Sequence, residues 1–276
     1  MAVATDTLER IVHAALAEDI GAGDVTTEAT VAADAVGTAA LVVKEPGIVC
    51  GLRAAEFTFR ALDPEIGFEA FAQDGDTVEA PAVVARVSGS LRAILTGERV
   101  ALNFLGRLSG IATLTRRYVD AIAGTGVAVL DTRKTTPGLR ALEKHAVAAG
   151  GGRNHRFGLD DAILVKDNHL RAAGSISEAV ELVRRASDLP IEVECDTLDQ
   201  VGEALEAGVD AILLDNMPPA RLRAVVALVD GRVPLEASGG VTLDTIRAVA
   251  EAGVDEISVG ALTHSASSLD VSLELT

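Results

Sequence analysis

The sequence predicts an α/β protein in two parts: a small α+β domain with an antiparallel sheet, and an incomplete βα barrel of about six parallel strands. Residues 1–110 mix helical and strand-like segments without regular alternation. From residue 127 onward, short apolar runs alternate with helical stretches, which is typical of buried parallel strands joined by helices. The second part lacks the G-x-G-x-x-G fingerprint of an open nucleotide-binding sheet, and this favours barrel-like closure.

The first domain is expected to span residues 1–110. It should begin with a helix, because apolar residues recur at helical spacing between Leu8 and Leu16. Further along, residues 53–62 read as a helix, and the expected strands are 37–46, 47–51, 66–71 and 81–89. Residues 91–123 are helical in pattern but contain Gly97, Gly106 and Gly110. We therefore expect interruptions at these glycines and a domain junction near Gly110.

The second domain is expected to span residues 111–266. Its strand-like runs are 127–131, 162–166, 191–195, 211–215, 233–237 and 256–260. The helical stretches between them include 175–187, 197–207, 218–229 and 242–252. We expect these strands to be buried on both faces. Residues 269–275 alternate with period two, which predicts that the terminal segment 267–276 returns to the first domain as a strand.

Composition argues against several classes of partner and location. The net charge of −17 argues against nucleic acid, because phosphate contacts need a basic face. No apolar run approaches the ~20 residues of a membrane span. The start of the chain does not read as a signal peptide. Cys50 and Cys195 lie far apart without metal-ligand spacing, so we expect a reduced, cytoplasmic protein.

One stretch, residues 131–171, differs from the acidic remainder. It holds eight Lys and Arg and five Asp and Glu, a balance of +3, so the rest of the chain carries −20. Such a local excess of cations is expected where a small polyanion binds. The alternative is a solvated loop with scattered charge. The glycine triplet at 150–152 and the strand-like runs inside the stretch argue against that alternative.

The carboxyl ends of the predicted strands carry charged residues and glycine turns. In a βα barrel the functional residues sit at this end of the strands. We therefore expect one mouth to contain Arg133, Lys134, Lys166, Glu194, Asp215, Ser238, Gly239, Gly240, Gly260 and Ala261. Charges of both signs at four separate strand ends are hard to explain by chance.

Two glycine turns, S-G-G at 238–240 and V-G-A at 259–261, follow the last two strands. Backbone N–H groups of such turns, and of a helix that follows, can hold a phosphate because no Cβ stands in the way. Val241 and Thr242 lead into the predicted helix 242–252, as this use requires. The alternative is that these glycines only form tight turns.

Glu194 and Asp215 are the acids expected in the mouth. Mg²⁺ usually takes one or two carboxylates together with phosphate oxygens of the substrate, so these two are candidate metal ligands. They could instead pair with Lys166 or Lys134. Both arrangements can hold, one without substrate and the other with it.

Other reactive side chains have less specific patterns. A Schiff base on Lys166, as in barrel aldolases, needs a neutral amine, and the neighbouring acids favour the charged form. We interpret His155 as a cationic or hydrogen-bonding contact beside Arg156. His145 is expected to be structural. Cys195 is expected to be a packing residue, because no His is placed to activate it.

The motifs of this chain resemble those of quinolinate phosphoribosyltransferase, also called carboxylating nicotinate-nucleotide pyrophosphorylase. In order, they are D-T-R-K-T-T-P-G-L-R (131–140), G-G-G-R-N-H-R (150–156), V-K-D-N-H (165–169), V-E-C-D (193–196), I-L-L-D-N (212–216), E-A-S-G-G-V (236–241) and S-V-G-A-L-T-H-S (258–265). E-D-I-G-A-G-D-V-T-T (18–27) and the segment 97–113 are similar as well, so the resemblance spans nearly the whole chain.

This resemblance implies a type II phosphoribosyltransferase fold. It implies the reaction of quinolinate with phosphoribosyl pyrophosphate, with Mg²⁺, to give nicotinate mononucleotide, CO₂ and pyrophosphate in NAD biosynthesis. It also implies a homodimer in which Arg99 reaches the neighbour's site. The implied substrate-binding residues are Arg99, Thr132, Arg133, Lys134, His155, Arg156, Lys166, Glu194, Asp215, Ser238, Gly239, Gly240, Val259, Gly260 and Ala261. Among them, Lys134, Lys166, Glu194 and Asp215 are the catalytic candidates, and Glu194 and Asp215 the candidate Mg²⁺ ligands.

Two alternatives stay open at this point. A relative of the same fold class could act on nicotinate or another ring acid, although a single carboxylate needs fewer cations than the set found here. A non-catalytic protein that binds a phosphorylated sugar could use the same barrel. The acids Glu194 and Asp215 argue against such a binder, because a site that only holds anions gains nothing from them.

Overall fold

The computed structural model describes residues 3–276, and these form two compact units. The N-terminal unit contains the chain up to Arg116 together with Thr135–Gly151 and Leu262–Thr276. The barrel unit contains Arg117–Lys134 and Gly152–Ala261. This division differs from the boundaries expected from the sequence chiefly in residues 135–151, which pack with the N-terminal unit. The predicted fold class is confirmed, with an antiparallel sheet in one unit and six parallel strands in the other.

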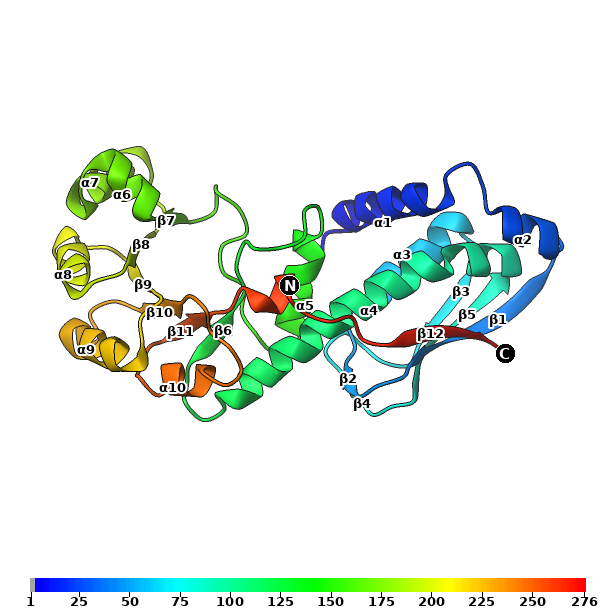
Figure 1. Ribbon diagram of the computed structural model, residues 1–276. Helices are drawn as coiled ribbons and strands as arrows, with labels where there is room; N and C mark the ends of the chain where they lie inside the picture. Colours follow the sequence, from blue (N-terminus) through cyan, green and yellow to red (C-terminus); the bar gives the residue numbers. More distant parts are fainter. Residues whose placement is uncertain (1–2) are drawn as a thin grey trace. The chain divides into compact units, whose positions relative to one another are not determined.

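The N-terminal unit is built on a four-stranded antiparallel sheet in the order β12-β1-β5-β3 (Figure 1). Its strands are β1 (Val36–Val43), β3 (Gly67–Ala70), β5 (Ala82–Ser90) and β12 (Val271–Leu275), with a separate pair β2 (Gly47–Ile48) and β4 (Thr77–Val78). The helices are α1 (Thr5–Ile20), α2 (Val25–Thr30), α3 (Leu52–Leu62), α4 (Leu91–Ala121), α5 (Arg140–Ala149) and α11 (Ala261–His264). The core is formed mainly by side chains of β1, β5, α3 and α4, among them Leu41, Phe59 and Ile94.

Helix α4 runs without a break from Leu91 to Ala121, so the interruptions expected at its glycines do not occur. The glycines serve close packing instead. A Cβ on Gly110 would lie 1.9 Å from the carbonyl oxygen of Ser267, and one on Gly106 would lie 2.9 Å from that of Leu269. Glycine costs conformational entropy inside a helix, but at these positions it allows the C-terminal segment to pass close to α4.

The barrel unit is a six-stranded parallel sheet in the order β6-β11-β10-β9-β8-β7. Its strands are β6 (Ala128–Leu130), β7 (Ile163–Val165), β8 (Ile191–Cys195), β9 (Ala211–Asp215), β10 (Leu235–Ser238) and β11 (Glu256–Ser258). The connecting helices are α6 (Asp167–Ala173), α7 (Ile176–Ala186), α8 (Leu198–Ala207), α9 (Pro219–Val229) and α10 (Ile246–Ala250). The first strand of this unit, β6, pairs with its last, β11, so the break in the barrel lies between β6 and β7.

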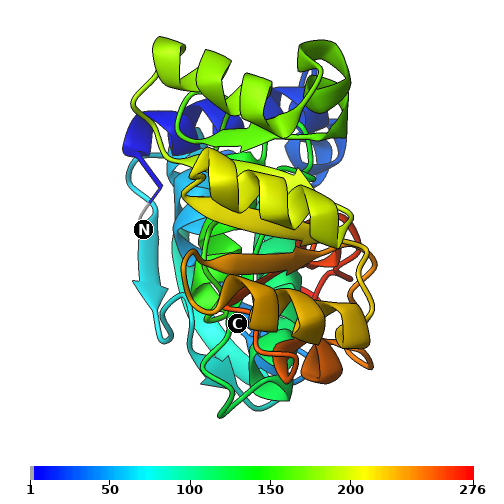
Figure 2. The ribbon, with the colours of Figure 1, turned by 90° about the vertical axis from the view of Figure 1, so that its left-hand side faces the viewer.

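Helices α7, α8 and α9 lie side by side over one face of this sheet (Figure 2). Their starts follow from local sequence: Ser175 caps α7, and Thr197 caps α8 by accepting the N–H of Gln200 at 3.2 Å. The capped helices bury apolar stripes against the strands, and this leaves the loops after each strand to carry the polar residues. Among residues 3–276, no helix combines the length and the apolar character needed to cross a membrane.

The inner face of the parallel sheet is not the apolar surface expected from the sequence. In β8, Ile191, Val193 and Cys195 are buried, whereas the alternate residues Glu192 and Glu194 are only partly buried. Successive side chains of a strand point to opposite faces, so the two glutamates share the face away from the helices. Glu236 of β10 and Glu256 of β11 are paired in register. The inner face therefore carries four acids, Glu192, Glu194, Glu236 and Glu256.

Candidate active site

Four neighbouring strands of the barrel unit each place one predicted site residue at the same edge of the sheet. Lys166 directly follows β7, Glu194 lies near the end of β8, and Asp215 and Ser238 end β9 and β10. Asp215 and Ser238 are register partners. The strand order β7-β8-β9-β10 therefore arranges an ammonium, two carboxylates and a hydroxyl along one edge, as the sequence predicted for a barrel mouth.

The cation and the acids of this edge interact. Nζ of Lys166 lies 3.9 Å from Oε2 of Glu194, so the alternative of an ion pair is realised here. Burial raises the pKa of Glu194, Lys166 opposes that shift, and Asp215 adds to it by repulsion. The two carboxylates thus destabilise each other's charge. A divalent cation would relieve this repulsion, and the residues present fit the oxygen-ligand chemistry of Mg²⁺.

Segment 153–156 lies beside β6 and brings a second group of cations to the mouth. The backbone of Arg153 forms a parallel bridge with Leu130, and its N–H donates to the carbonyl of Val129 at 2.8 Å. Oδ1 of the fully buried Asp131 accepts the N–H of His155 at 2.9 Å. These bonds place residues 155 and 156 next to the segment that follows β6, where Thr132 accepts the N–H of Lys134 at 3.0 Å.

Arg133 and Arg156 lie close enough to influence each other's charge. Burial lowers the pKa of Arg156, and the Arg133 guanidinium lowers it further, while acids nearby act in the opposite direction. Nη1 of Arg156 also donates to the carbonyl of Ala162 at 3.1 Å, which holds the side chain in place. Two guanidiniums held near each other favour binding of an anion, because an anion removes their repulsion.

His155 is held by two glutamates of the inner face. Its Nε2 lies 3.1 Å from Oε2 of Glu192 and 3.2 Å from Oε2 of Glu236. The carboxylates outweigh the effect of burial and raise the pKa of His155 to about 10. Sequence reasoning missed Glu192, Glu236 and Asp131 as part of the site. A glutamate at alternate positions of an otherwise apolar strand, as in I-E-V-E-C, was the available signal.

The two glycine turns follow β10 and β11 at the same edge. Gly239 and Gly240 have φ angles of 90° and 60°, and a Cβ on Gly239 would lie 2.3 Å from Oδ1 of Asn216. The turn therefore requires glycine and presents backbone atoms only. Val259 donates its N–H to the carbonyl of Leu130 at 2.9 Å, which anchors the second turn to β6.

The helix predicted over 242–252 is shorter than expected, since α10 begins only at Ile246. Residues 241–245 form turns, and Thr245 Oγ1 accepts the N–H of Thr242 at 2.9 Å. The glycine turn of 238–240 is therefore not joined directly to a helix N-terminus. Phosphate binding at this turn would depend on the backbone of the turn itself.

Not every residue of the basic stretch belongs to the barrel mouth. Residues 140–149 form α5 in the N-terminal unit, where Glu143 and Lys144 are buried. Oε1 of Glu143 accepts from Nη2 of Arg107 at 2.9 Å. His145 contacts Asp74 at 2.8 Å. The charged residues of the stretch are thus divided between the two units, and only residues 131–134 and 152–171 belong to the barrel unit.

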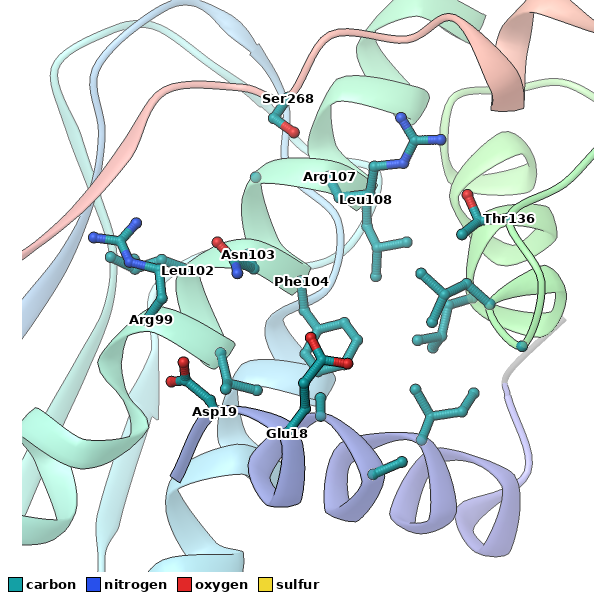
Figure 3. A pocket seen from close by; sticks show the side chains of 18 of the residues that line it. Glu18, Asp19, Arg99, Leu102, Asn103, Phe104, Arg107, Leu108, Thr136 and Ser268 are labelled. Carbon is teal, nitrogen blue, oxygen red and sulfur yellow. The ribbon is translucent and has the colours of Figure 1, made fainter. Parts of the chain in front are cut away.

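Arg99 lies on α4 in the N-terminal unit, whereas the other predicted site residues belong to the barrel unit. It lines a cavity of about 1030 Å³ formed by α1, α4 and the segments 136–139 and 268–271. Figure 3 shows Arg99 on the same wall as Asn103, with Asp19 on the facing helix α1. Within this unit Arg99 is a charged residue at the edge of a largely apolar cavity.

The two cysteines are buried, and neither forms a disulfide. Burial raises the pKa of the Cys195 thiol to about 12, and Asp196 adds to the shift. A thiol with such a pKa stays protonated near neutral pH and is a poor nucleophile.

His169 Nδ1 accepts the N–H of Lys166 at 3.0 Å, so this histidine orders the start of α6.

The chain is thus an α/β protein whose incomplete βα barrel carries cations, carboxylates and glycine turns at the carboxyl ends of its strands. Within this class, the chain belongs to the quinolinate phosphoribosyl transferase family. Residues 24–109 match the family's N-terminal domain and residues 111–274 match its C-terminal domain.

Relatives from several organisms support this membership. The chain is 48% identical over 265 residues to a probable nicotinate-nucleotide pyrophosphorylase (carboxylating) of Synechocystis, covering 94% of this chain and 90% of that protein. A Bacillus subtilis protein of the same name is 44% identical over 271 residues, covering 98% and 93% respectively. The solved structure of the Francisella tularensis nicotinate-nucleotide pyrophosphorylase has a TM-score of 0.96 at 40% identity, covering 100% of this chain and 98% of that one.

Proposed function

We propose that this chain transfers the phosphoribosyl group of phosphoribosyl pyrophosphate to the ring nitrogen of quinolinate and releases the 2-carboxylate as CO₂, giving nicotinate mononucleotide for NAD biosynthesis. Family membership supports the reaction. The observation that carries the assignment of the site is the proximity of Arg133 to Arg156, in a unit that also places Lys166 after β7 and a glycine turn after β10.

The guanidiniums and His155 are assigned to the diacid. Quinolinate carries two carboxylates on adjacent ring carbons, and arginine can bind a carboxylate through two parallel hydrogen bonds. Arg133 and Arg156 repel each other without an anion, so a doubly charged ring would relieve more repulsion than a singly charged one. This favours quinolinate over nicotinate. Lys166, which follows β7, is the third cation of this group, with Thr132 a candidate neutral contact.

The phosphoribosyl donor is assigned to the opposite part of the mouth. Its 5′-phosphate would be bound by the turns Ser238–Gly239–Gly240 and Val259–Gly260–Ala261, because glycine lets the chain approach phosphate oxygens closely. The pyrophosphate would lie toward Lys134 and the two acids of the mouth. The donor's C1 then faces the diacid between the two groups of residues.

Glu194 and Asp215 would hold Mg²⁺, which supplies charge neutralisation for the pyrophosphate when it is bound. The same carboxylates can stabilise positive charge that develops on the sugar as its C1–oxygen bond breaks. Positioning of the two substrates by the fixed cations supplies much of the remaining acceleration. No nucleophile from the protein is required, because the ring nitrogen itself forms the new bond to C1.

The decarboxylation follows from the first step. Once the ring nitrogen bonds to C1 of the sugar, the nitrogen is cationic. Electrons of the bond between C2 and its carboxylate can then move toward the ring as CO₂ leaves, and C2 takes up a proton. A dedicated base is not needed for this step. Accumulation of phosphoribosylated quinolinate as the final product would show that the two steps are not coupled in this way.

We also propose that the working enzyme is a homodimer in which Arg99 of one subunit completes the diacid site of the other. In support of this, Arg99 borders a cavity in the N-terminal unit that is lined mainly by α1 and α4, whereas the other cations belong to the barrel unit. A cytoplasmic location fits the two reduced, buried cysteines.

The proposed reaction is tested by incubating the purified chain with quinolinate, the phosphoribosyl donor and MgCl₂ while CO₂ and mononucleotide are measured. Nicotinate replaces quinolinate in the control. Production of mononucleotide from nicotinate, without turnover of quinolinate, would assign the chain to a different ring acid. Absence of any product from either acid would contradict the proposal.

The remaining alternatives have their own tests. If the chain only binds a phosphorylated sugar, neither the parent nor the variants Glu194→Ala and Asp215→Ala will turn over quinolinate. We expect both variants to lose turnover while quinolinate binding, followed by calorimetry, is retained. A Schiff base at Lys166 would be trapped by borohydride as a covalent adduct of added mass, and we expect none by mass spectrometry.

A further inference from the structure

The environment of His155 is unusual for a residue of an anion-binding pocket. Its single Nε2 lies within hydrogen-bonding distance of two carboxylates, Glu192 at 3.1 Å and Glu236 at 3.2 Å. The side chain of Glu236 is only 4% exposed. Both glutamates come from the inner face of the sheet, one from β8 and one from β10, with β9 between them. The ring is thus fixed from two strands at once.

The three side chains could in principle hold a metal ion, since their donor atoms lie within 4.8 Å of one another. The hydrogen bonding of the ring argues against this use. A metal-bound imidazole normally donates its other N–H to an acceptor. Here the backbone N–H of Arg156 points at Nδ1 of His155 at 2.8 Å, so Nδ1 faces a donor. The cluster is therefore better described as an imidazole hydrogen-bonded by two carboxylates.

Both nitrogens of the ring are thus engaged. Nε2 faces the carboxylates of Glu192 and Glu236, and the Arg156 N–H donates to Nδ1. Contacts on both sides of the ring fix its orientation, and those on Nε2 are to ionisable acceptors, which make the stronger hydrogen bonds.

Apart from its contact with His155, the surroundings of Glu236 are unfavourable for a carboxylate. Among residues 3–276, its Oε1 is buried and has no hydrogen-bond partner. Glu192 and Glu256 lie near it, and burial and then repulsion from Glu236 raise the pKa of each. Burying a carboxylate with one oxygen unsatisfied destabilises the fold, and an apolar residue of the same size would be tolerated better. Such a group needs an explanation in function.

We propose that Glu236 is a positioning residue of the diacid pocket: with Glu192, it holds the His155 ring in a fixed orientation for the substrate. Asp131 fixes the main chain of the same residue by accepting its N–H at 2.9 Å. Both the backbone and the ring of His155 are thus held before substrate arrives. The inference rests on the proposed assignment of His155 to the diacid.

The test is steady-state kinetics with each substrate varied in turn. Glu236→Gln keeps the shape and a hydrogen-bond acceptor but removes the charge. We expect the KM for quinolinate to rise about tenfold, the effect of weakening one charge-assisted hydrogen bond. The KM for the phosphoribosyl donor and kcat should change less than about threefold, since neither depends on the orientation of this ring. Glu192→Gln, which removes the other carboxylate, should act in the same direction.

The matched control is Glu256→Gln. Glu256 is the register partner of Glu236 on β11, shares its face of the sheet and pairs with Arg153 at 3.7 Å rather than with His155. We expect parental constants for this variant. In ¹⁵N spectra of histidine-labelled protein at pH 8, the His155 ring nitrogens should have the same chemical shifts in the parent and in Glu256→Gln. In Glu236→Gln the Nε2 signal should shift, because this nitrogen loses a charged acceptor.

Failure of this inference can be told apart from failure of the proposed function. Suppose that the parent turns over quinolinate and that His155→Ala raises the KM for quinolinate. If Glu236→Gln and Glu192→Gln then match the parent in this KM and in the spectra, the positioning role is wrong. A parental KM in His155→Ala would overturn it too. If the parent itself makes no mononucleotide, the proposed function fails instead, and the His155 spectra still test whether Glu236 contacts and orients the ring.

Discussion

Nε2 of His145 lies 2.8 Å from Oδ2 of Asp74, and this contact ties α5 to the start of α3. The other oxygen of Asp74 accepts the N–H groups of Gly51 and Leu52 at 2.9 and 3.2 Å. One carboxylate thus satisfies the first donors of a helix and pairs with a histidine 71 residues further along the chain. The expected structural role of His145 is consistent with this arrangement.

The pH dependence of stability should report this contact. Burial of Asp74 acts to raise its pKa, but the bonds from His145 and from the backbone outweigh it, and the pKa is lowered from 3.8. A carboxyl with a lowered pKa stabilises the fold above its unfolded pKa and loses that contribution as the pH falls through the folded value. Asp74→Asn should therefore lower the free energy of unfolding by about 1–2 kcal/mol at pH 7 and by less below about pH 4.

Urea unfolding at several pH values measures this difference. Asp34→Asn, at an exposed position, is the control and should change stability little at any pH. A penalty for Asp74→Asn that stays constant down to pH 3 would show that the charge of the carboxylate is not what stabilises this contact.

Gly110 should be intolerant of any side chain. Its missing Cβ would fall 1.9 Å from the Ser267 carbonyl, so Gly110→Ala must displace the C-terminal segment from α4. We expect a loss of about 3 kcal/mol in the free energy of unfolding, the upper end for overpacked sites. Thermal unfolding measures it.

Gly202 in α8 is the matched control, because nothing lies within 4 Å of the Cβ it would gain. Gly202→Ala should stabilise the protein by about 0.5–1 kcal/mol, the usual gain of alanine over glycine inside a helix. Equal effects of the two substitutions would mean that the close approach at Ser267 does not limit packing.

The turn at 238–240 should be sensitive at its first glycine. Gly239→Ala places a Cβ 2.3 Å from Oδ1 of Asn216 and at a φ of 90°, so the turn must change shape. We expect the KM for the phosphoribosyl donor to rise at least about tenfold, because the phosphate-binding N–H groups move. The KM for quinolinate should stay near the parental value. Steady-state kinetics with the donor varied provides the measurement.

Gly240→Ala is the comparison, since its Cβ would have nothing within 4 Å and only the φ of 60° is unfavourable. Its effect should be several-fold smaller, corresponding to about 1 kcal/mol of backbone strain. If both variants keep the parental KM for the donor, the phosphate is bound elsewhere.

A site shared between subunits predicts complementation of inactive variants. Arg99→Ala and Asp215→Asn should each be nearly inactive alone. After the two are unfolded and refolded together, about one quarter of the sites should be complete, because half of the dimers are mixed and each has one site without either substitution. Activity should recover to about that fraction of the parental value. No recovery, with dimers present by light scattering, would place Arg99 in its own subunit's site.

Local periodicity and motif order were enough to predict much of this protein. The runs at 191–195 and 211–215 are strands at those bounds, and the predicted fold class is confirmed. This succeeded because hydrophobic period reflects the geometry of a single element, which neighbouring residues determine by themselves. The residues that follow each strand could also be named, because the edge they share is a property of parallel connection.

Contacts between distant segments could not be predicted in this way. The sequence pattern predicts breaks in α4 at its glycines. In the structure, position 110 needs glycine because the carbonyl of Ser267, remote in sequence, lies where a Cβ would be. Likewise, the identity of the acids that face His155 depends on which strands flank one another and in what register. The sequence by itself determined the elements and the chemistry available at their ends. Only the tertiary structure decided which side chains share a hydrogen bond, because register and close approach are set by the packing of the whole unit.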